Sequence, residues 1–468
     1  SRLVELAKEM GIDVERPVSM QGDIPYRFTR NKAIAHLERN FFSYPYQVYR
    51  EKTGSLGILS AANPYSEVEA AARQIIHLCR DKGLRYRDMA VVAKDLDSYE
   101  KLVRIIFGEY RIPFFIDKKR AVSDHPLAML VLSALAIIQK NFTYETVFRY
   151  LKTGLSGIGT EEVDLLENYV LANGIRGSQW YSEGEWSYRL NYSFGDEDAG
   201  ENEKAIIEKV NHIRHKVAEP LLELKKGLKE AKLAPDACLC LYEFLCHIGI
   251  PDRVEELAEK YREQKQLEAA EEYKQIWDVI IQVLDQIVEV SGDENMTLER
   301  LSGFLNIGFS QYDMGLIPHS GDQLLVGSID RWRSHEIEAL FILGVNDGVF
   351  PSAVRDEGML SDKDREMLKS LGLELALDTK TKAFQEQYLL YTTLTKAGRY
   401  LRISYPAADH EGKALRPSYV IGKLKRIFPN LESMSTILGD GEAMDLIGPP
   451  LPSFNYLIGF LRNLANNE

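Results

Sequence analysis

The stretch from Leu324 to Pro351, LLVGSIDRWRSHEIEALFILGVNDGVFP, decides the fold of this 468-residue chain. Two short apolar runs, 324–326 and 340–345, are separated by a polar, charged loop, and an Asn-Asp-Gly turn follows the second run. Apolar runs of this length between turn residues are typical of strands buried in a sheet that is covered on both faces. Because open parallel sheets bind ligands beyond the carboxyl ends of their strands, we expect the functional site in the loop from Ser328 to Glu338.

The chain on both sides of this stretch alternates between strand-like and helix-like patterns. Before it, the patterns predict strands at 56–61, 88–94 and 112–116 and helices at 65–82, 97–107 and 126–139. After it, they predict helices at 356–371 and 379–396 and a strand at 400–405. Such alternation forms a parallel, doubly wound sheet, so we predict an α/β fold. Ser123 or Asp124 is expected to cap the helix that follows it, and His125 to have a structural or capping role.

A change of pattern divides the chain into domains. Helical periodicity prevails almost throughout residues 141–320, and the sheet pattern resumes at Leu324. We therefore predict a sheet domain made of residues 1–140 and 321–426, with a large all-α subdomain, 141–320, inserted into it. The Pro449-Pro450-Leu451-Pro452 run marks residues 427–468 as a linker toward a further, C-terminal domain.

Composition restricts the class of protein. Hydrophobic residues make up 45% of the chain, which indicates a globular protein. No apolar run reaches the roughly 18 residues that a membrane span needs, so no membrane association is expected. The four cysteines form no C-x-x-C pair and fit a reducing cytosol, which predicts a cytoplasmic protein. Cysteines 238, 240 and 246 and the histidine pair 212 and 215 lack zinc-site spacing, so no metal site is expected.

The charge of the chain is unevenly distributed. The net charge of −13 is unusual for a nucleic-acid-binding protein, since phosphate binding needs positive charge. The segment 396–426 nevertheless contains eight basic residues against Asp409 and Glu411: Lys396, Arg399, Arg402, Lys413, Arg416, Lys423, Lys425 and Arg426. A DNA-binding face can therefore coexist with an acidic body.

The quoted stretch resembles a motif of the UvrD-like superfamily-one helicases, T-x-H-x-x-K-G-x-E, followed by an apolar strand and a G-x-x-x-G-x-F-P turn. In this chain the motif positions are occupied by Ser328, Asp330, Arg333, Ser334 and Glu336. The frame is retained, whereas most of the chemical groups differ. The turn Gly344–Pro351, GVNDGVFP, looks most like the AddB (RexB) family, the B subunits of the bacterial ATP-dependent helicase/deoxyribonuclease, whose helicase core is similarly degenerate.

Two further segments resemble nucleotide-site motifs of these helicases. Arg27 stands where the helicases carry the arginine of N-Y-R-S-T, which reaches the nucleotide. Residues 384–397 resemble E-E-R-R-L-x-Y-V-x-x-T-R-A, but Gln387 and Tyr388 replace the two arginines and Lys396 replaces the third. The resemblance implies a RecA-like second helicase domain with an inserted helical subdomain, in which Arg27, Glu336 and Gln387 mark a degenerate nucleotide site.

ATP hydrolysis of the helicase kind needs a glycine-rich loop with its lysine, an acidic pair that holds Mg²⁺, and arginines on the γ-phosphate. The chain has no G-x-x-x-x-G-K-[ST] sequence, and no predicted strand ends in Asp-Glu. We therefore expect the chain by itself to have no catalytic residue, no cofactor and no ATPase activity. The resemblance implies ATP and Mg²⁺ for the complex as a whole, and an iron–sulfur cluster only in a nuclease domain outside this sequence.

The predicted function is that of a degenerate, DNA-binding helicase domain that acts in double-strand-break end processing and recombinational repair, including recognition of a hotspot sequence. The resemblance implies an AddA-type motor subunit as the partner in a heterodimer and single-stranded DNA as the ligand. Trp332 is expected to stack on a base and Arg333 to touch a phosphate. The full set of predicted DNA contacts is Ser328, Asp330, Arg331, Trp332, Arg333, Asn346, Lys396 and Arg399.

Three alternatives remain open. Trp332 could instead pack beneath the helical subdomain while Arg333 pairs with Glu336 or Glu338. The chain could also be a docking scaffold for the motor subunit that does not contact DNA. A RecB-type nuclease is the third alternative, since Gly327–Arg331 resembles G-x-x-D-R-x-D and Asp378–Lys380 resembles D-x-K; Arg333, however, replaces the second aspartate, and the spacing is long.

Overall fold

The computed structural model describes residues 2–16, 28–29, 31–118, 120–187, 197–264, 266–292, 294–315, 321–331, 337–353, 360–373, 375–436 and 448–465. The chain forms two compact units. One unit comprises Ser1–Asp117 and Ser320–Glu468, and the other comprises Lys118–His319. The second unit is thus inserted into the sequence of the first.

The first unit is built on a seven-stranded sheet with the order β3-β6-β2-β7-β8-β1-β9. Every strand pair in this sheet is parallel. The quoted stretch supplies two strands on either side of β2: Val91 pairs with Val326 of β6 and with Phe341 of β7. The strands are β1 Thr53–Ala61, β2 Met89–Ala93, β3 Phe114–Asp117, β6 Leu324–Ser328, β7 Ile337–Leu343, β8 Ala397–Pro406 and β9 Leu431–Ser435.

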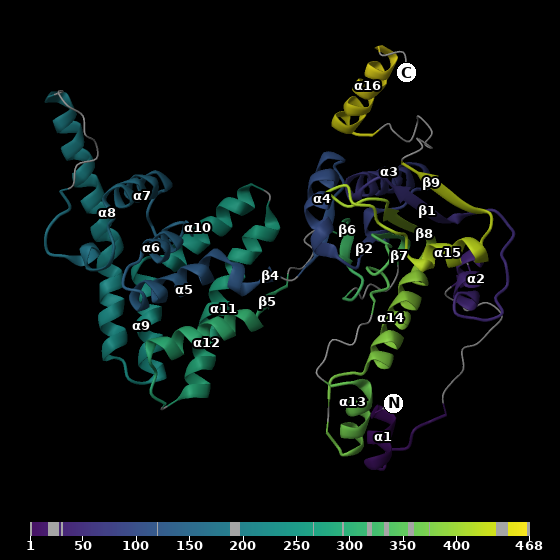
Figure 1. The fold of residues 1–468 in the computed structure, drawn as a ribbon, viewed down its shortest axis with the longest axis horizontal. Helices are drawn as coiled ribbons and strands as arrows, with labels where there is room; N and C mark the ends of the chain where they lie inside the picture. Colours follow the sequence, from purple (N-terminus) through teal and green to yellow (C-terminus); the bar gives the residue numbers. More distant parts are fainter. Residues whose placement is uncertain are drawn as a thin grey trace. The chain divides into compact units, whose positions relative to one another are not determined.

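Helices cover both faces of this sheet (Figure 1). One face packs against α3 (Pro64–Lys82) and α4 (Leu96–Glu109), and the other against α2 (Lys32–Asn40), α14 (Thr379–Leu394) and α15 (Tyr419–Ile427). Side chains alternate along a strand, so in β7 Phe341 points toward α3 and α4, whereas Leu340 and Ile342 point toward α2, α14 and α15. The predicted α/β fold, a RecA-like parallel-sheet domain with an inserted helical subdomain, is confirmed.

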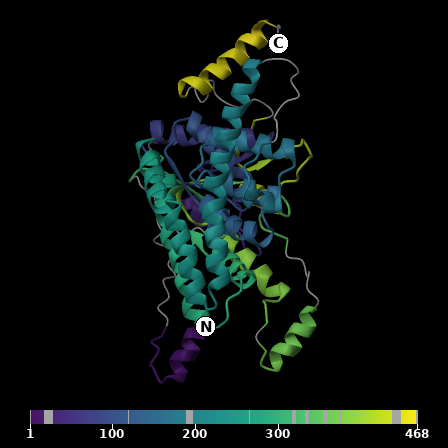
Figure 2. The same ribbon diagram turned by 90° about the vertical axis from the view of Figure 1, so that its left-hand side faces the viewer.

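The second unit is helical apart from the two-stranded antiparallel pair β4 (Arg120–Ala121) and β5 (Asp313–Met314). The α-helices are α5 Pro126–Gln139, α6 Tyr144–Leu151, α7 Thr160–Asn173, α8 Glu197–Glu230, α9 Ala234–His247, α10 Ile250–Glu263, α11 Leu267–Ser291 and α12 Leu298–Gln311. Figure 2 shows α8, with 34 residues, as a long helix that runs through the unit. The guanidinium of Arg214 in α8 is buried and donates to the backbone oxygens of Trp180, Ser182 and Gly184.

Two boundaries differ from the sequence-based division at 141 and 427. The helical unit begins at Lys118, because the apolar side chains of α5 pack into its core rather than onto the sheet. The N-cap of α5 is His125, whose Nδ1 accepts from Leu127 N–H at 3.1 Å, and not Ser123 or Asp124. Within 427–468, β9 pairs with β1 at the edge of the sheet. The helix α16 (Pro450–Ala465) follows in the same segment, and the guanidinium of Arg73 in α3 lies over the ring of its Tyr456.

The remaining described helices are α1 (Arg2–Glu9) and α13 (Asp362–Ser370), both in the first unit. None of the helices in the part of the chain that the structure describes is both long enough and apolar enough to span a bilayer.

A buried carboxyl group ties the sheet to its helices. Glu67 of α3 is inaccessible to solvent and accepts hydrogen bonds from Gly344 N–H at 2.9 Å, from the Ser404 hydroxyl at 2.5 Å and from the Tyr99 hydroxyl at 2.5 Å. Burial raises the pKa of Glu67, and these three hydrogen bonds offset only part of that effect. Gly344 has a positive φ of 68°, so its backbone N–H reaches the carboxylate in a conformation that favours glycine.

Glu67→Gln should become more stable relative to the wild type as the pH rises. Because the folded-state pKa of Glu67 lies above its unfolded value, its contribution to stability is fully present below the unfolded pKa and is lost as the pH rises through the folded pKa. Glutamine cannot ionise and keeps an oxygen for Gly344 and Ser404. Chemical denaturation between about pH 4 and pH 8 measures the difference in the free energy of unfolding. A pH-independent difference would contradict the prediction, and Glu67→Ala should cost about 3 kcal/mol because it leaves three buried donors unpaired.

Candidate site at the carboxyl edge of the sheet

Three charged side chains meet beyond the carboxyl ends of β2 and β6. Lys94 directly follows β2, Asp330 lies in the loop after β6, and Glu386 projects from α14. The Lys94 ammonium is 2.7 Å from Asp330 Oδ1 and 2.8 Å from Glu386 Oε1. Lys94 and Glu386 are largely buried, whereas Asp330 is about half exposed. The parallel sheet brings these groups together because neighbouring strands end at the same edge.

The environment keeps Lys94 and Glu386 charged. Burial lowers the pKa of Lys94, but its hydrogen bonds to Asp330 and Glu386 outweigh burial and raise that pKa. For Glu386, burial raises the pKa, and hydrogen bonds from Lys94 and from Ser352 N–H at 3.1 Å outweigh burial and lower it. Glu386 therefore joins α14 both to β2 and to the segment that follows Pro351.

An open groove of about 480 Å³ lies beside this cluster. Its lining comes mainly from one side of α14 and includes Asp330, Thr381, Phe384, Gln385, Glu386, Tyr388, Leu389 and Thr392. The aromatic rings of Phe384 and Tyr388 are exposed there. The groove thus combines flat apolar rings with a charge cluster in which one lysine faces two carboxylates.

This arrangement suits phosphate or metal binding poorly. The Lys94 ammonium is already bound by two carboxylates, so the cluster carries one net negative charge, and a bound phosphate would add to it. Gln387, at the predicted arginine position, is exposed on α14 and carries no charge. Within the described ranges, no group of three or more His, Cys, Asp or Glu side chains could hold a metal ion.

The nuclease alternative relied on Asp330 and Asp378. Asp330 binds Lys94, and Asp378 caps α14 by accepting from Thr381 N–H at 2.6 Å. That hydrogen bond is the largest cause of a lowered pKa at Asp378. Both carboxylates thus have partners with structural roles, and the geometry gives the nuclease alternative no support.

The structure places three of the predicted DNA-binding residues at this edge: Asp330, Ser328 and Arg331. Ser328 ends β6, paired with Ala93, and Arg331 lies in the following turn with its guanidinium 3.6 Å from Asp117. Lys396 and Arg399 lie instead at the opposite, amino edge of the sheet, where Lys396 is half-buried between α14 and the start of β8. Arg399 is exposed in β8, and its Nε is 3.7 Å from Glu338 Oε2.

Asn346 differs from its prediction as a DNA contact. Its side chain is buried, and its Nδ2 donates to the backbone oxygens of Pro406 at 3.0 Å and Arg416 at 3.1 Å. Both amide hydrogens are thus used to join the turn after β7 to the segments after β8. Asn346 has a structural role because the GVNDGVFP turn folds inward.

The remaining predicted positions, Arg27, Trp332, Arg333 and Glu336, lie outside the described residues. The sequence reading also missed two members of the cluster, Lys94 and Glu386. A signal for Lys94 was present, since it directly follows a buried strand, as Ser328 does, and the carboxyl ends of parallel strands share an edge.

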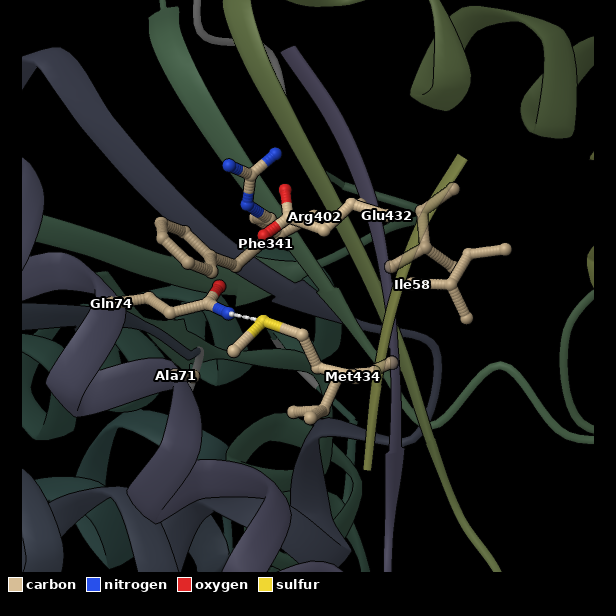
Figure 3. A pocket seen from close by; sticks show the side chains of 11 residues that line it. Ile58, Ala71, Gln74, Phe341, Arg402, Glu432 and Met434 are labelled. Atoms are coloured by element: carbon tan, nitrogen blue, oxygen red, sulfur yellow. Dashed lines mark hydrogen bonds between the residues drawn. The ribbon is translucent and has the colours of Figure 1, made fainter. Parts of the chain in front are cut away.

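A second cavity is too small to hold a ligand. It lies between β1, β8, β9 and α3, and its volume is about 10 Å³, about the size of a single water-sized probe. Figure 3 shows Gln74 of α3 and Met434 of β9 side by side in its lining, joined by a hydrogen bond of 3.5 Å. We therefore assign this cavity to packing.

Lys94→Met should destabilise the sheet unit by about 2 kcal/mol, a value between those of exposed and buried ion pairs, because it leaves the largely buried Glu386 carboxylate without its cation. Asp330→Asn should cost only about 0.5 kcal/mol, since Asp330 is half exposed. In Lys94→Met/Glu386→Gln, more than half of the loss should be recovered. Denaturant unfolding measures the free energy of unfolding of each variant. Equal losses for Lys94→Met and Asp330→Asn would contradict the prediction that the buried Glu386 depends on Lys94.

Comparison with curated proteins finds relatives of the whole chain. A protein of Acetivibrio thermocellus, named as the B subunit of an ATP-dependent helicase/deoxyribonuclease, is 49% identical over 470 residues, which cover 100% of this chain and 41% of that protein. Proteins with the same name from Clostridium botulinum strain Loch Maree and from Caldanaerobacter subterraneus are both 46% identical, over 99% and 98% of this chain and 40% of each protein.

The chain therefore spans about two fifths of the length of these relatives. No protein-family model matches it. The identity nevertheless extends over both the sheet unit and the helical unit, and the resemblance of the GVNDGVFP turn to the helicase/deoxyribonuclease subunits is thereby confirmed. The chain belongs to the AddB family.

Proposed function

We propose that this chain is a helicase-like body that holds single-stranded DNA during the processing of double-strand ends, without hydrolysing ATP by itself. The observation that carries the proposal is the occupied lysine at the carboxyl edge of the sheet: Lys94 is held by Asp330 and Glu386, and an uncharged Gln387 stands where active helicases place an arginine. A RecA-like frame that keeps its sheet, and whose described residues show no uncommitted cation at the Lys94 cluster, is suited to binding rather than to phosphoryl transfer.

Single-stranded DNA is the proposed ligand because cations and aromatic rings are exposed on the sheet unit, with Arg331 at the carboxyl edge and Arg399 at the amino end of β8. Arg331 and Arg399 are exposed on the sheet unit, and their carboxylate neighbours are 3.6 and 3.7 Å away, at distances typical of weak surface pairs. Trp332 and Arg333 continue the same loop in the sequence. Recognition of a recombination hotspot sequence belongs to the same proposal.

The proposed partner is an AddA-type motor subunit. The relatives are named as B subunits, which supports an assembly with at least one other subunit. ATP and Mg²⁺ would then act in the complex, any iron–sulfur cluster would belong to a nuclease domain outside this sequence, and the complex would work in the cytoplasm. A docking scaffold without DNA contact is the second candidate, favoured by exposed apolar side chains on α13 and in the segment that follows it, Met367, Leu371 and Leu373.

The purified chain should show no ATP turnover, with or without single-stranded DNA. The physical reason is the missing phosphate loop together with Gln387 and Lys396 at two arginine positions. A coupled phosphate-release assay measures turnover. Activity above background that Glu336→Gln abolishes would overturn the proposal that the chain does not hydrolyse ATP.

Trp332→Ala should weaken the binding of single-stranded DNA roughly tenfold, because stacking on one base contributes about 1–3 kcal/mol. Arg333→Ala should reduce the slope of log K against log salt concentration by about 0.7, the value for one phosphate contact on a single strand. Fluorescence anisotropy at several salt concentrations measures both effects. A lowered melting temperature of Trp332→Ala, or unchanged affinity, would assign the loop a structural role instead.

A further inference from the structure

Aromatic rings continue from the groove across the surface of the sheet unit. The rings of Tyr388 and Tyr391 in α14 are stacked, with centroids 6.4 Å apart and an interplanar angle of 27°. Tyr391 is followed by Phe42, in the loop after α2, at 6.3 Å. The ammonium of Lys423 in α15 lies 5.5 Å from the centre of the Phe42 ring and 4.8 Å from that of Phe41.

This row of aromatic rings and Lys423 extends by one helical turn at each end. Phe384 precedes Tyr388 by four residues on α14, and Tyr419 precedes Lys423 by four residues on α15, so each lies on the same helix face as its neighbour. We call this set the aromatic track: Phe384, Tyr388, Tyr391, Phe42, Lys423 and Tyr419. It starts in the groove at the carboxyl edge and joins α14, the loop after α2, and α15.

Packing of the fold does not account for the track. Leu390 and Leu394 fill the core beneath α14, while Val420 and Leu424 fill it beneath α15. The track rings are exposed in contrast: 59% for Phe384, 69% for Tyr388, 44% for Phe42 and 57% for Tyr419. Several large rings exposed in one connected row indicate a binding surface.

The charges along the track suit a polyanion. Lys423 has no carboxylate within ion-pair distance among the described residues, and Lys425 and Arg426 follow it on the exposed side of α15. Acidic groups also lie near the track: Glu38 accepts from the Tyr391 hydroxyl at 2.9 Å and keeps its negative charge, whereas Glu386 and Asp330 share Lys94. Available cations beside flat rings are the combination that single-stranded nucleic acids bind without sequence preference.

We propose that the aromatic track is a path for single-stranded nucleic acid, in which bases stack on Tyr388 and Phe42 and Lys423 contacts the backbone phosphate. This inference rests on the proposed DNA-binding function but assigns the contact to residues outside the loop 330–334. A protein surface would also cover exposed rings, but the cations without carboxylate partners favour the nucleic acid.

The test compares variants of the chain for binding to fluorescently labelled oligo(dT). Tyr388→Leu and Phe42→Leu should each weaken binding about tenfold, whereas Tyr388→Phe, which keeps the ring, should bind like the wild type. Lys423→Ala should lower the salt slope by about 0.7. The matched control is Tyr65→Leu: Tyr65 is 45% exposed on α3, on the opposite face of the sheet, and this variant should leave affinity unchanged.

The outcomes separate the two proposals. If the wild type does not bind oligo(dT), both the proposed function and the track are overturned. If the wild type binds and both leucine variants bind equally well, only the track is overturned, and its rings are then a protein-docking surface. Ultraviolet cross-linking of oligo(dT) containing 4-thiothymidine keeps the test decisive if a variant unfolds. Wild-type cross-links in peptides with Tyr388 or Phe42 support the track, and cross-links confined to other peptides refute it.

Discussion

The sheet unit depends on one buried carboxyl group, Glu67, which is held by three hydrogen-bond donors. Glu67 binds donors that lie 32, 277 and 337 residues away in the sequence, in α4, after β7 and in β8. Because no single segment supplies these partners, the network forms only when α3, α4 and the sheet have all assembled. Burying a carboxyl group is costly unless hydrogen bonds compensate, so each of the three donors constrains the fold strongly.

The same network gives the GVNDGVFP turn a structural role. Gly344 donates to Glu67 with its backbone, and Asn346, two residues later, joins two backbone oxygens after β8. The GVNDGVFP turn therefore holds strands together. Gln387, by contrast, is exposed on α14, so a change of its side chain would leave the core of the fold undisturbed.

The strands and helices could be predicted from the sequence where burial imposes a regular spacing of apolar residues. β7 is buried on both faces, and the apolar run 340–345, which covers its second half, identified it before its position in the sheet was known. β9 was missed because Leu431–Ser435 is a half-exposed edge strand whose sequence, LESMS, has no such run. The sequence reading assigned α5 to the sheet domain, whereas α5 packs into the core of the helical unit. An apolar helix does not reveal from its sequence which surface it will cover. Lys94 pairs with residues 236 and 292 positions away, and no local pattern encodes such a distance.

The acidic composition and the proposed DNA binding are compatible for a physical reason. The net charge of −13 opposes the approach of DNA from solution, but at physiological salt charges separated by more than about 8 Å are largely screened. Contact then depends on groups within that distance, such as Lys423 beside Phe42. Stacking on rings does not rely on net charge at all. Long-range repulsion therefore slows capture from solution more than it weakens a formed contact.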